Sequence, residues 1–159
     1  MYKRKFLLIL VILLINGCVS SNNNFNNLNN ISLSGSNETR NYDNYVFQEH
    51  LNRIFKTEID KPKMYSLKTI ISFESANALT SNNLTSLQKT IATVTFKIYD
   101  FKTQKILKTG SIKSSPAIGS TSSSLFSNDI NLKHIKERLN KSLALKLSKY
   151  LNLIIPKLK

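Results

Sequence analysis

The 159-residue sequence is poor in the residues that build most catalytic and cofactor sites, with one cysteine, four glycines and two histidines. A single cysteine excludes an intramolecular disulfide, so the fold must depend on packing alone. Four scattered glycines exclude the glycine-rich fingerprints that bind nucleotides. The isolated His50 and His134 lack the spacing of a metal site.

Nucleophiles with a neighbouring base are also absent from the sequence pattern. Ser122, Ser123 and Ser124 lie in a serine-rich stretch that reads as a loop, with no general base nearby in the sequence. Because no catalytic combination is present, we expect a protein that is not an enzyme and that needs no cofactor.

Acidic residues are scarce, since 9 Asp and Glu stand against 23 Lys and Arg for a net charge of +14. The imbalance is greatest from Phe101 onward, where Asp129 and Glu137 are the only acids. Such a balance predicts an anionic partner, which could be nucleic acid, phospholipid headgroups or a phosphorylated glycolipid. The alternative is that the lysines form a solvated surface.

The sequence has one long apolar run, Phe6 to Ile15, and it is too short to span a membrane. Ten residues of helix cover about 15 Å, whereas a bilayer core is about 30 Å thick. Lys3, Arg4 and Lys5 precede the run, which gives the order of a secretory signal. We therefore predict a cleaved signal peptide at residues 1–17, and export argues against nucleic acid as the partner.

Gly17 followed by Cys18 resembles the lipobox of bacterial lipoproteins, although Asn16 departs from the usual small residue. We predict cleavage between Gly17 and Cys18 and lipid attachment at Cys18, which would tether the chain to a membrane without crossing it. No Asp follows the cysteine, and this resembles lipoproteins that are sent to the outer membrane. The polar stretch 18–30 is predicted to be a flexible tether.

Residues 31–159 are predicted to form a single α+β domain, a small two-layer sandwich. About four mostly antiparallel strands would carry two helices on one face. The alternation of Ala92, Val94, Phe96 and Ile98 with polar residues gives the clearest strand. The expected strands are 31–34, 64–74, 90–99 and 105–113, the helices are 41–59 and about 127–155, and the loops are 76–87 and 114–127.

The last helix carries an apolar stripe from Leu132 to Ile154 and lysines on its other sides. A basic amphipathic helix can lie on a membrane surface, but a stripe this regular favours packing against the sheet.

With these elements in order, the chain resembles the lipopolysaccharide-assembly lipoproteins, the LptE family. The resemblance rests on the short strand Ile31–Gly35, the helix with Phe47, Gln48 and Leu51, the strand end Ile98-Tyr99-Asp100, the glycine-ended return strand 106–110, and the terminal helix around 143–147. Thr90–Thr93 and the loop 114–127 depart from the family pattern.

The resemblance implies a lipid-anchored protein on the periplasmic side of the outer membrane. It would plug a large β-barrel translocon, help that barrel to assemble, and handle lipopolysaccharide. Lysines near the predicted hairpin could then pair with the phosphates of lipid A. The candidates are Lys97, Lys102, Lys105, Lys108 and Lys113.

Two other functions fit the sequence. An accessory lipoprotein of an ABC-type lipid-transport system would have a similar small domain, and a surface-exposed adhesive lipoprotein would share the anchor. Co-purification with a large barrel, and protease treatment of intact cells, would separate the three.

Overall fold

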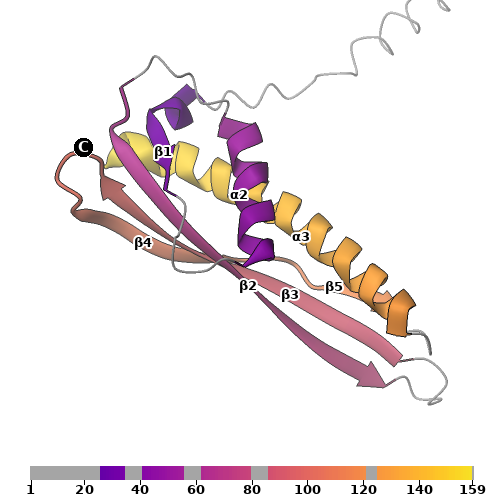
Figure 1. Ribbon diagram of the computed structural model, residues 1–159. Coiled ribbons are helices and arrows are strands. Elements are labelled where there is room, and N and C mark those ends of the chain that lie inside the picture. The colour runs from indigo at the N-terminus through magenta and orange to yellow at the C-terminus, as the bar shows by residue number, and fades with distance from the viewer. Residues whose placement is uncertain (1–25, 35–40, 56–61, 80–85, 121–124, 159) are drawn as a thin grey trace, which may run out of the picture.

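The structure, a computed structural model, describes residues 26–34, 41–55, 62–79, 86–120 and 125–158. Two helices cover one face of a five-stranded sheet (Figure 1). This arrangement confirms the predicted α+β sandwich. Within the described ranges, no helix is long and apolar enough to cross a membrane. The elements are η1 (Asn26–Asn30), β1 (Ile31–Leu33), α2 (Tyr42–Phe55), β2 (Tyr65–Leu79), β3 (Ser86–Asp100), β4 (Ile106–Lys113), β5 (Ala117–Ser120), α3 (Leu125–Ile154) and η2 (Ile155–Lys157).

The sheet has the strand order β1-β2-β3-β4, and β5 also pairs with β3. The β2–β3 and β3–β4 pairs are antiparallel, as expected. The β1–β2 pair is parallel, with Ile31 opposite Tyr65. This follows from the chain order, because α2 lies between the two strands and parallel neighbours need such a crossover.

Strands β2 and β3 are much longer than predicted. Each has 15 residues, and they pair along their whole length from Tyr65–Asp100 to Leu79–Ser86. The predicted loop 76–87 is therefore wrong at both of its ends. Backbone pairing between the two strands holds this part of the ribbon together. Such pairing does not require alternating apolar residues, so the sequence shows no strand pattern there. At about 3.3 Å per residue the ribbon is about 50 Å long, and Figure 1 shows its twist.

The predicted loop 114–127 also needs correction, because it contains β5 and the start of α3. Residues Ala117–Ser120 pair with Leu87–Thr90 of β3. The physical reason is that β3 extends beyond β4, so β5 occupies the remaining backbone groups on that edge. Helix α3 begins at Leu125, slightly before the predicted cap at Ser127–Asp129.

The hydrophobic core lies between the sheet and the helices. Ala92, Val94, Phe96 and Ile98 of β3 are buried, as their alternation predicts. The terminal helix packs on the sheet, as its stripe predicts. Its buried apolar residues recur mostly every four positions, so the stripe winds slowly around the helix and follows the twisted sheet. They are Ile135, Leu139, Leu143, Ala144, Leu147 and Leu151.

Part of the predicted tether belongs to the folded domain. Residues Asn26–Asn30 form the 3-10 helix η1, and Leu28 is fully buried. The Met64 backbone N–H donates to the Asn30 carbonyl at 2.9 Å. The buried leucine and the hydrogen bonds to Asn29 and Asn30 attach this polar segment to the domain, so the tether prediction is wrong for residues 26–30. The signal, Gly17, Cys18 and the rest of the tether lie outside the described residues.

Polar contacts hold α2 in place above the sheet. The Asn44 Oδ1 atom accepts a hydrogen bond from the Ile71 backbone N–H of β2 at 2.7 Å. The Lys136 Nζ atom of α3 lies 2.8 Å from the Asp43 carboxylate of α2 and 5.0 Å from the Phe73 ring centre. These contacts join α2, α3 and β2 on one face of the sheet.

Candidate functional site

The sheet face turned away from α2 and α3 carries no described helix, and we call it the open face. Successive residues of a strand point to opposite sides, so the neighbours of the buried β2 and β3 residues lie on this face. Its side chains are mostly hydroxyl and cationic. The exposed members are Lys68, Ile70, Ser72, Glu74 and Ala76 of β2, Lys89, Thr95 and Lys97 of β3, Ile106, Thr109, Ser111 and Lys113 of β4, and Ile118 of β5.

Two lysines stand directly opposite each other on the open face. Lys68 of β2 pairs in register with Lys97 of β3, and both side chains are exposed. The Lys68 Nζ atom lies 5.4 Å from the ring centre of Tyr99, which places Tyr99 on the same face. Directly opposite residues have Cβ atoms about 5 Å apart, and like charges in this arrangement destabilise a sheet.

The lysine pair has no acidic partner among the described residues. The ion pairs of this part of the chain join Arg53 to Glu49 and Lys136 to Asp43, all on the helices. The acid of the open face, Glu74, is opposite Ile91 and six residues along β2 from Lys68. The pair is therefore a cationic site that an anion would stabilise.

The predicted lysines are distributed over three places. Lys97 and Lys113 lie on the open face, but Lys113 is opposite Thr93, about 13 Å along the strand from Lys97. Lys108 is opposite Ile98 and therefore belongs to the helix side, at the exposed edge of β4. Lys102 and Lys105 are exposed in the β3–β4 turn.

Lys68 is a cationic residue of the open face that was not among the lysines predicted from the sequence. Its place between Leu67 and Thr69 puts it on the polar face of the predicted strand 64–74. What the sequence does not contain is the register that brings Lys68 opposite Lys97. The register of a hairpin depends on the length of its loop. The predicted loop 76–87 does not fix this length, so the sequence does not place Lys68 opposite Lys97.

The β3–β4 turn is organised around Asp100. Its Oδ1 atom accepts hydrogen bonds from the backbone N–H of Thr103 at 2.7 Å, from the Thr103 hydroxyl at 2.9 Å and from the Lys102 N–H at 3.0 Å. The hydrogen bonds from Thr103 are the main reason that the pKa of Asp100 is lowered from its ordinary value, with Lys102 adding to the effect. The Asp100 carboxylate is thus used to hold the turn together through these three hydrogen bonds.

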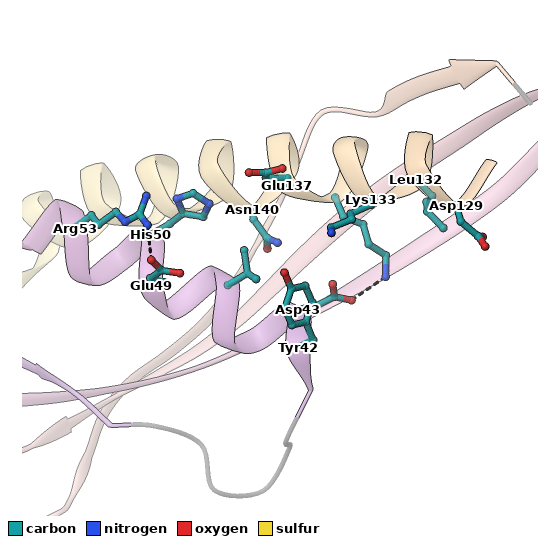
Figure 2. A pocket seen from close by; sticks show the side chains of 12 residues that line it. Tyr42, Asp43, Glu49, His50, Arg53, Asp129, Leu132, Lys133, Glu137 and Asn140 are labelled. Atoms are coloured by element: carbon teal, nitrogen blue, oxygen red, sulfur yellow. Dashed lines mark hydrogen bonds and ion pairs between the residues drawn. The ribbon is translucent and has the colours of Figure 1, made fainter. Parts of the chain in front are cut away.

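A second candidate site is a groove of about 530 Å³ between α2 and α3 (Figure 2). Its charges are mixed, and two acid–base pairs lie within it. A groove of this kind does not present the single sign of charge that attracts a phosphate group. It is lined by Tyr42, Asp43, Val46, Glu49, His50, Arg53, Asp129, Leu132, Lys133, Lys136, Glu137 and Asn140.

Asn140 lies between the two helices in this groove (Figure 2). Its side chain is 2% exposed, and its Oδ1 atom is buried without a hydrogen-bond partner. An unpaired acceptor of this kind costs about 1–3 kcal/mol. The Asn140 Oδ1 atom can therefore accept a hydrogen bond from one donor, such as a water molecule. The described lining residues include no group of three side chains that could hold a metal ion.

Neither histidine takes part in a metal centre within the described ranges. His50 lines the groove between the helices, and His134 lies beside Gly119 and Arg138 at a shallow depression near β5. No group of three His, Cys, Asp or Glu side chains that could hold a metal ion occurs in this part of the chain.

No protein-family profile and no curated protein matches the chain. Solved structures do match it. A candidate lipoprotein from Caulobacter crescentus CB15 superimposes with a TM-score of 0.65 at 14% identity, over 85% of this chain and 96% of that one.

Two further structures are similar. Rare lipoprotein B from Shewanella oneidensis has a TM-score of 0.54 at 15% identity, over 77% of this chain and 97% of its own. A minor lipoprotein from Acinetobacter baumannii has a TM-score of 0.51 at 16% identity, over 77% of this chain and 91% of its own. At such identities the likeness shows a shared fold, a fold found in bacterial proteins described as lipoproteins.

Proposed function

We propose that this chain is a lipoprotein of the bacterial outer membrane, lipidated at Cys18 and facing the periplasm. In this proposal it is not an enzyme. It assists lipopolysaccharide transport and assembly as a plug and assembly partner of a large β-barrel translocon, and its open face binds the phosphates of lipid A.

Two lines of support point to the envelope. The lipobox-like Gly17-Cys18 pair follows a signal-like apolar run, and the fold is shared with three proteins described as lipoproteins. One of these is rare lipoprotein B, another name for LptE, which is the family that the sequence resembles.

The observation that carries the binding role is the Lys68–Lys97 pair on the open face. Opposed like charges reduce the stability of the sheet, and no described carboxylate lies beside them. A phosphate between the two ammonium groups would remove this repulsion and accept a charge-assisted hydrogen bond from each. The hydroxyl groups of Thr95 and Thr109 flank the lysines and could donate further.

The first experiment is an affinity pull-down of the tagged, lipidated protein from detergent-solubilised outer membranes, followed by mass spectrometry. Stoichiometric recovery of a large β-barrel supports the plug function. Recovery of an inner-membrane transporter would instead indicate the ABC-type accessory function. Recovery of no partner, with digestion of the protein on intact cells, would favour the surface-exposed function.

The lipid A contact has a separate test with a matched control. The variant Lys68→Glu/Lys97→Glu should bind purified lipopolysaccharide on the order of tenfold more weakly, since each exposed pairing contributes up to about 1 kcal/mol. The control Lys141→Glu/Lys149→Glu makes the same change in net charge at exposed positions of α3. Equal losses in both variants would mean that only the overall charge matters.

A further inference from the structure

One end of the sheet combines exposed apolar side chains with lysines. Met64 is 50% exposed, Phe101 42% and Ile106 49%. Lys102 and Lys105 lie in the β3–β4 turn, beside Phe101 and Ile106, and are exposed. We call these five residues the anchor-end surface.

The five residues are close together in space although they come from two segments of the chain. The Phe101 N–H donates to the Met64 carbonyl at 2.9 Å, which continues the β2–β3 ladder by one step. Ile106 is in register with Tyr99, whose ring lies under the Lys68 ammonium on the open face. The apolar side chains therefore sit where the open face ends.

The charge of this end favours an anionic surface. Neither Lys102 nor Lys105 forms an ion pair within 4.0 Å among the described residues, although the charge of Lys102 acts on the neighbouring Asp100. The one carboxylate of the turn, Asp100, is engaged by its hydrogen bonds to Thr103 and Lys102. Exposed apolar side chains beside lysines are typical of surfaces that rest at the boundary between lipid headgroups and acyl chains.

The path of the chain brings the same end toward the lipid anchor. The Asn30 carbonyl accepts the Met64 N–H, so η1 joins the fold at this end of the sheet. Cys18 precedes Asn26, the first residue of η1, by eight peptide bonds, which span at most about 29 Å. The β2–β3 ribbon is about 50 Å long. The chain between Cys18 and η1 is therefore too short to bring the lipid to the opposite end of the ribbon, whereas the anchor-end surface is within its reach.

We propose that the anchor-end surface inserts into the headgroup layer of the membrane that holds the Cys18 lipid, with Phe101, Met64 and Ile106 below the headgroups and Lys102 and Lys105 paired with anionic lipids. This inference rests on the lipid anchor of the proposed function. Acyl chains alone hold the protein without orienting it. The inserted surface fixes the orientation of the long sheet relative to the bilayer, so the open face is presented to a partner in one direction.

The chain contains no tryptophan, so a single introduced tryptophan reports on its own surroundings. The reporter is Phe101→Trp, with Ile106→Trp as a second reporter. The control is Ile118→Trp in β5, which is 65% exposed and lies toward the other end of the sheet opposite Lys89. The chain from Cys18 onward, which includes every described residue, is coupled through its one thiol to maleimide lipids in vesicles of phosphatidylglycerol and phosphatidylethanolamine.

On coupling, the emission of the tryptophan at 101 should shift to the blue and lose its quenching by acrylamide, while the one at 118 stays accessible. Replacing Lys102 and Lys105 with Glu should weaken binding of the uncoupled chain to the same vesicles about fivefold for each lysine lost. Unchanged accessibility at both 101 and 106, or equal shielding at 101 and 118, would overturn the proposal. Because the thiol coupling replaces cellular lipidation, this result is independent of the pull-down.

Discussion

Gly110 in β4 faces the ring of Phe96, and no space remains there for a methyl group. A Cβ atom at this position would lie 2.7 Å from Phe96 Cζ. The ring cannot move away easily, because Phe96 is buried and its centroid lies 5.6 Å from that of Tyr150. We expect Gly110→Ala to lower the free energy of unfolding by about 1–3 kcal/mol, measured by urea denaturation.

Gly119 provides the matched control. A Cβ atom there would meet Ile135 Cδ1 at 2.6 Å, but this atom is the end of a flexible side chain that can change rotamer. Gly119→Ala should therefore cost clearly less than Gly110→Ala. An equal cost would show that the Phe96 ring adjusts as freely as the Ile135 methyl group does.

Asp100 gives the turn a dependence on pH. Hydrogen bonds from Thr103 lower its pKa below the usual 3.8, so the folded state favours the carboxylate. The stabilisation is present above the pKa of the unfolded chain and is lost as the pH falls through the lower folded value. Asp100→Asn keeps an Oδ1 acceptor without the charge, so wild type should be more stable than this variant at pH 7.

The comparison is made by urea denaturation at pH 7 and at about pH 3, near and below the ordinary carboxyl range. The difference between wild type and Asp100→Asn should shrink on acidification, whereas Asp100→Ala should be less stable than Asp100→Asn at both pH values. A constant difference between wild type and Asp100→Asn would show that the charge of Asp100 does not contribute.

At the scale of elements, Asn44 attaches α2 to the sheet beyond the end of β1. Its Oδ1 atom accepts the Ile71 N–H in a buried position, on the edge of β2 that β1 leaves unpaired after Leu67. In Asn44→Ala this N–H would remain buried without an acceptor, at a cost of about 1–3 kcal/mol. Hydrogen exchange should show faster exchange at Ile71 than in wild type, and protection at Val94 should fall only as far as global stability does.

Some elements could be predicted from the sequence because their burial is periodic. The alternation at Ala92–Ile98 and the stripe of α3 record which face meets the core. β5, η1 and the outer half of the β2–β3 ribbon could not be predicted in this way. A strand such as β5 forms because an edge of β3 is available, and η1 forms around the single buried Leu28.

The same reasoning explains what could be predicted of the candidate site. A basic, exposed Lys97 follows from the strand pattern, but its partner Lys68 depends on a register between strands that the alternation does not contain. Lys102 and Lys105 could be placed in a turn, yet their neighbour Met64 comes from a distant segment. The sequence contains the residue types of the site, and the sheet determines which of them meet.

At the scale of the whole molecule, part of the positive charge lies where it does not stabilise the fold, as at the opposed Lys68 and Lys97. Lys68 and Lys97 repel each other, and opposed like charges cost a few tenths to about 1 kcal/mol. Lys97→Thr introduces a residue that favours strands, between the existing Thr95 and Tyr99. It should raise the free energy of unfolding by about 0.5 kcal/mol at low salt and by less at 1 M salt, where charges are screened.

The same variant should bind lipopolysaccharide more weakly, so stability and binding would change in opposite directions. Lys113→Thr is the control, because Lys113 is exposed on the same face but lies opposite Thr93 instead of another lysine. It should leave stability and binding nearly unchanged. If Lys97→Thr neither stabilised the protein nor weakened binding, the opposed lysines would be a solvated surface, and the positive charge would need another explanation.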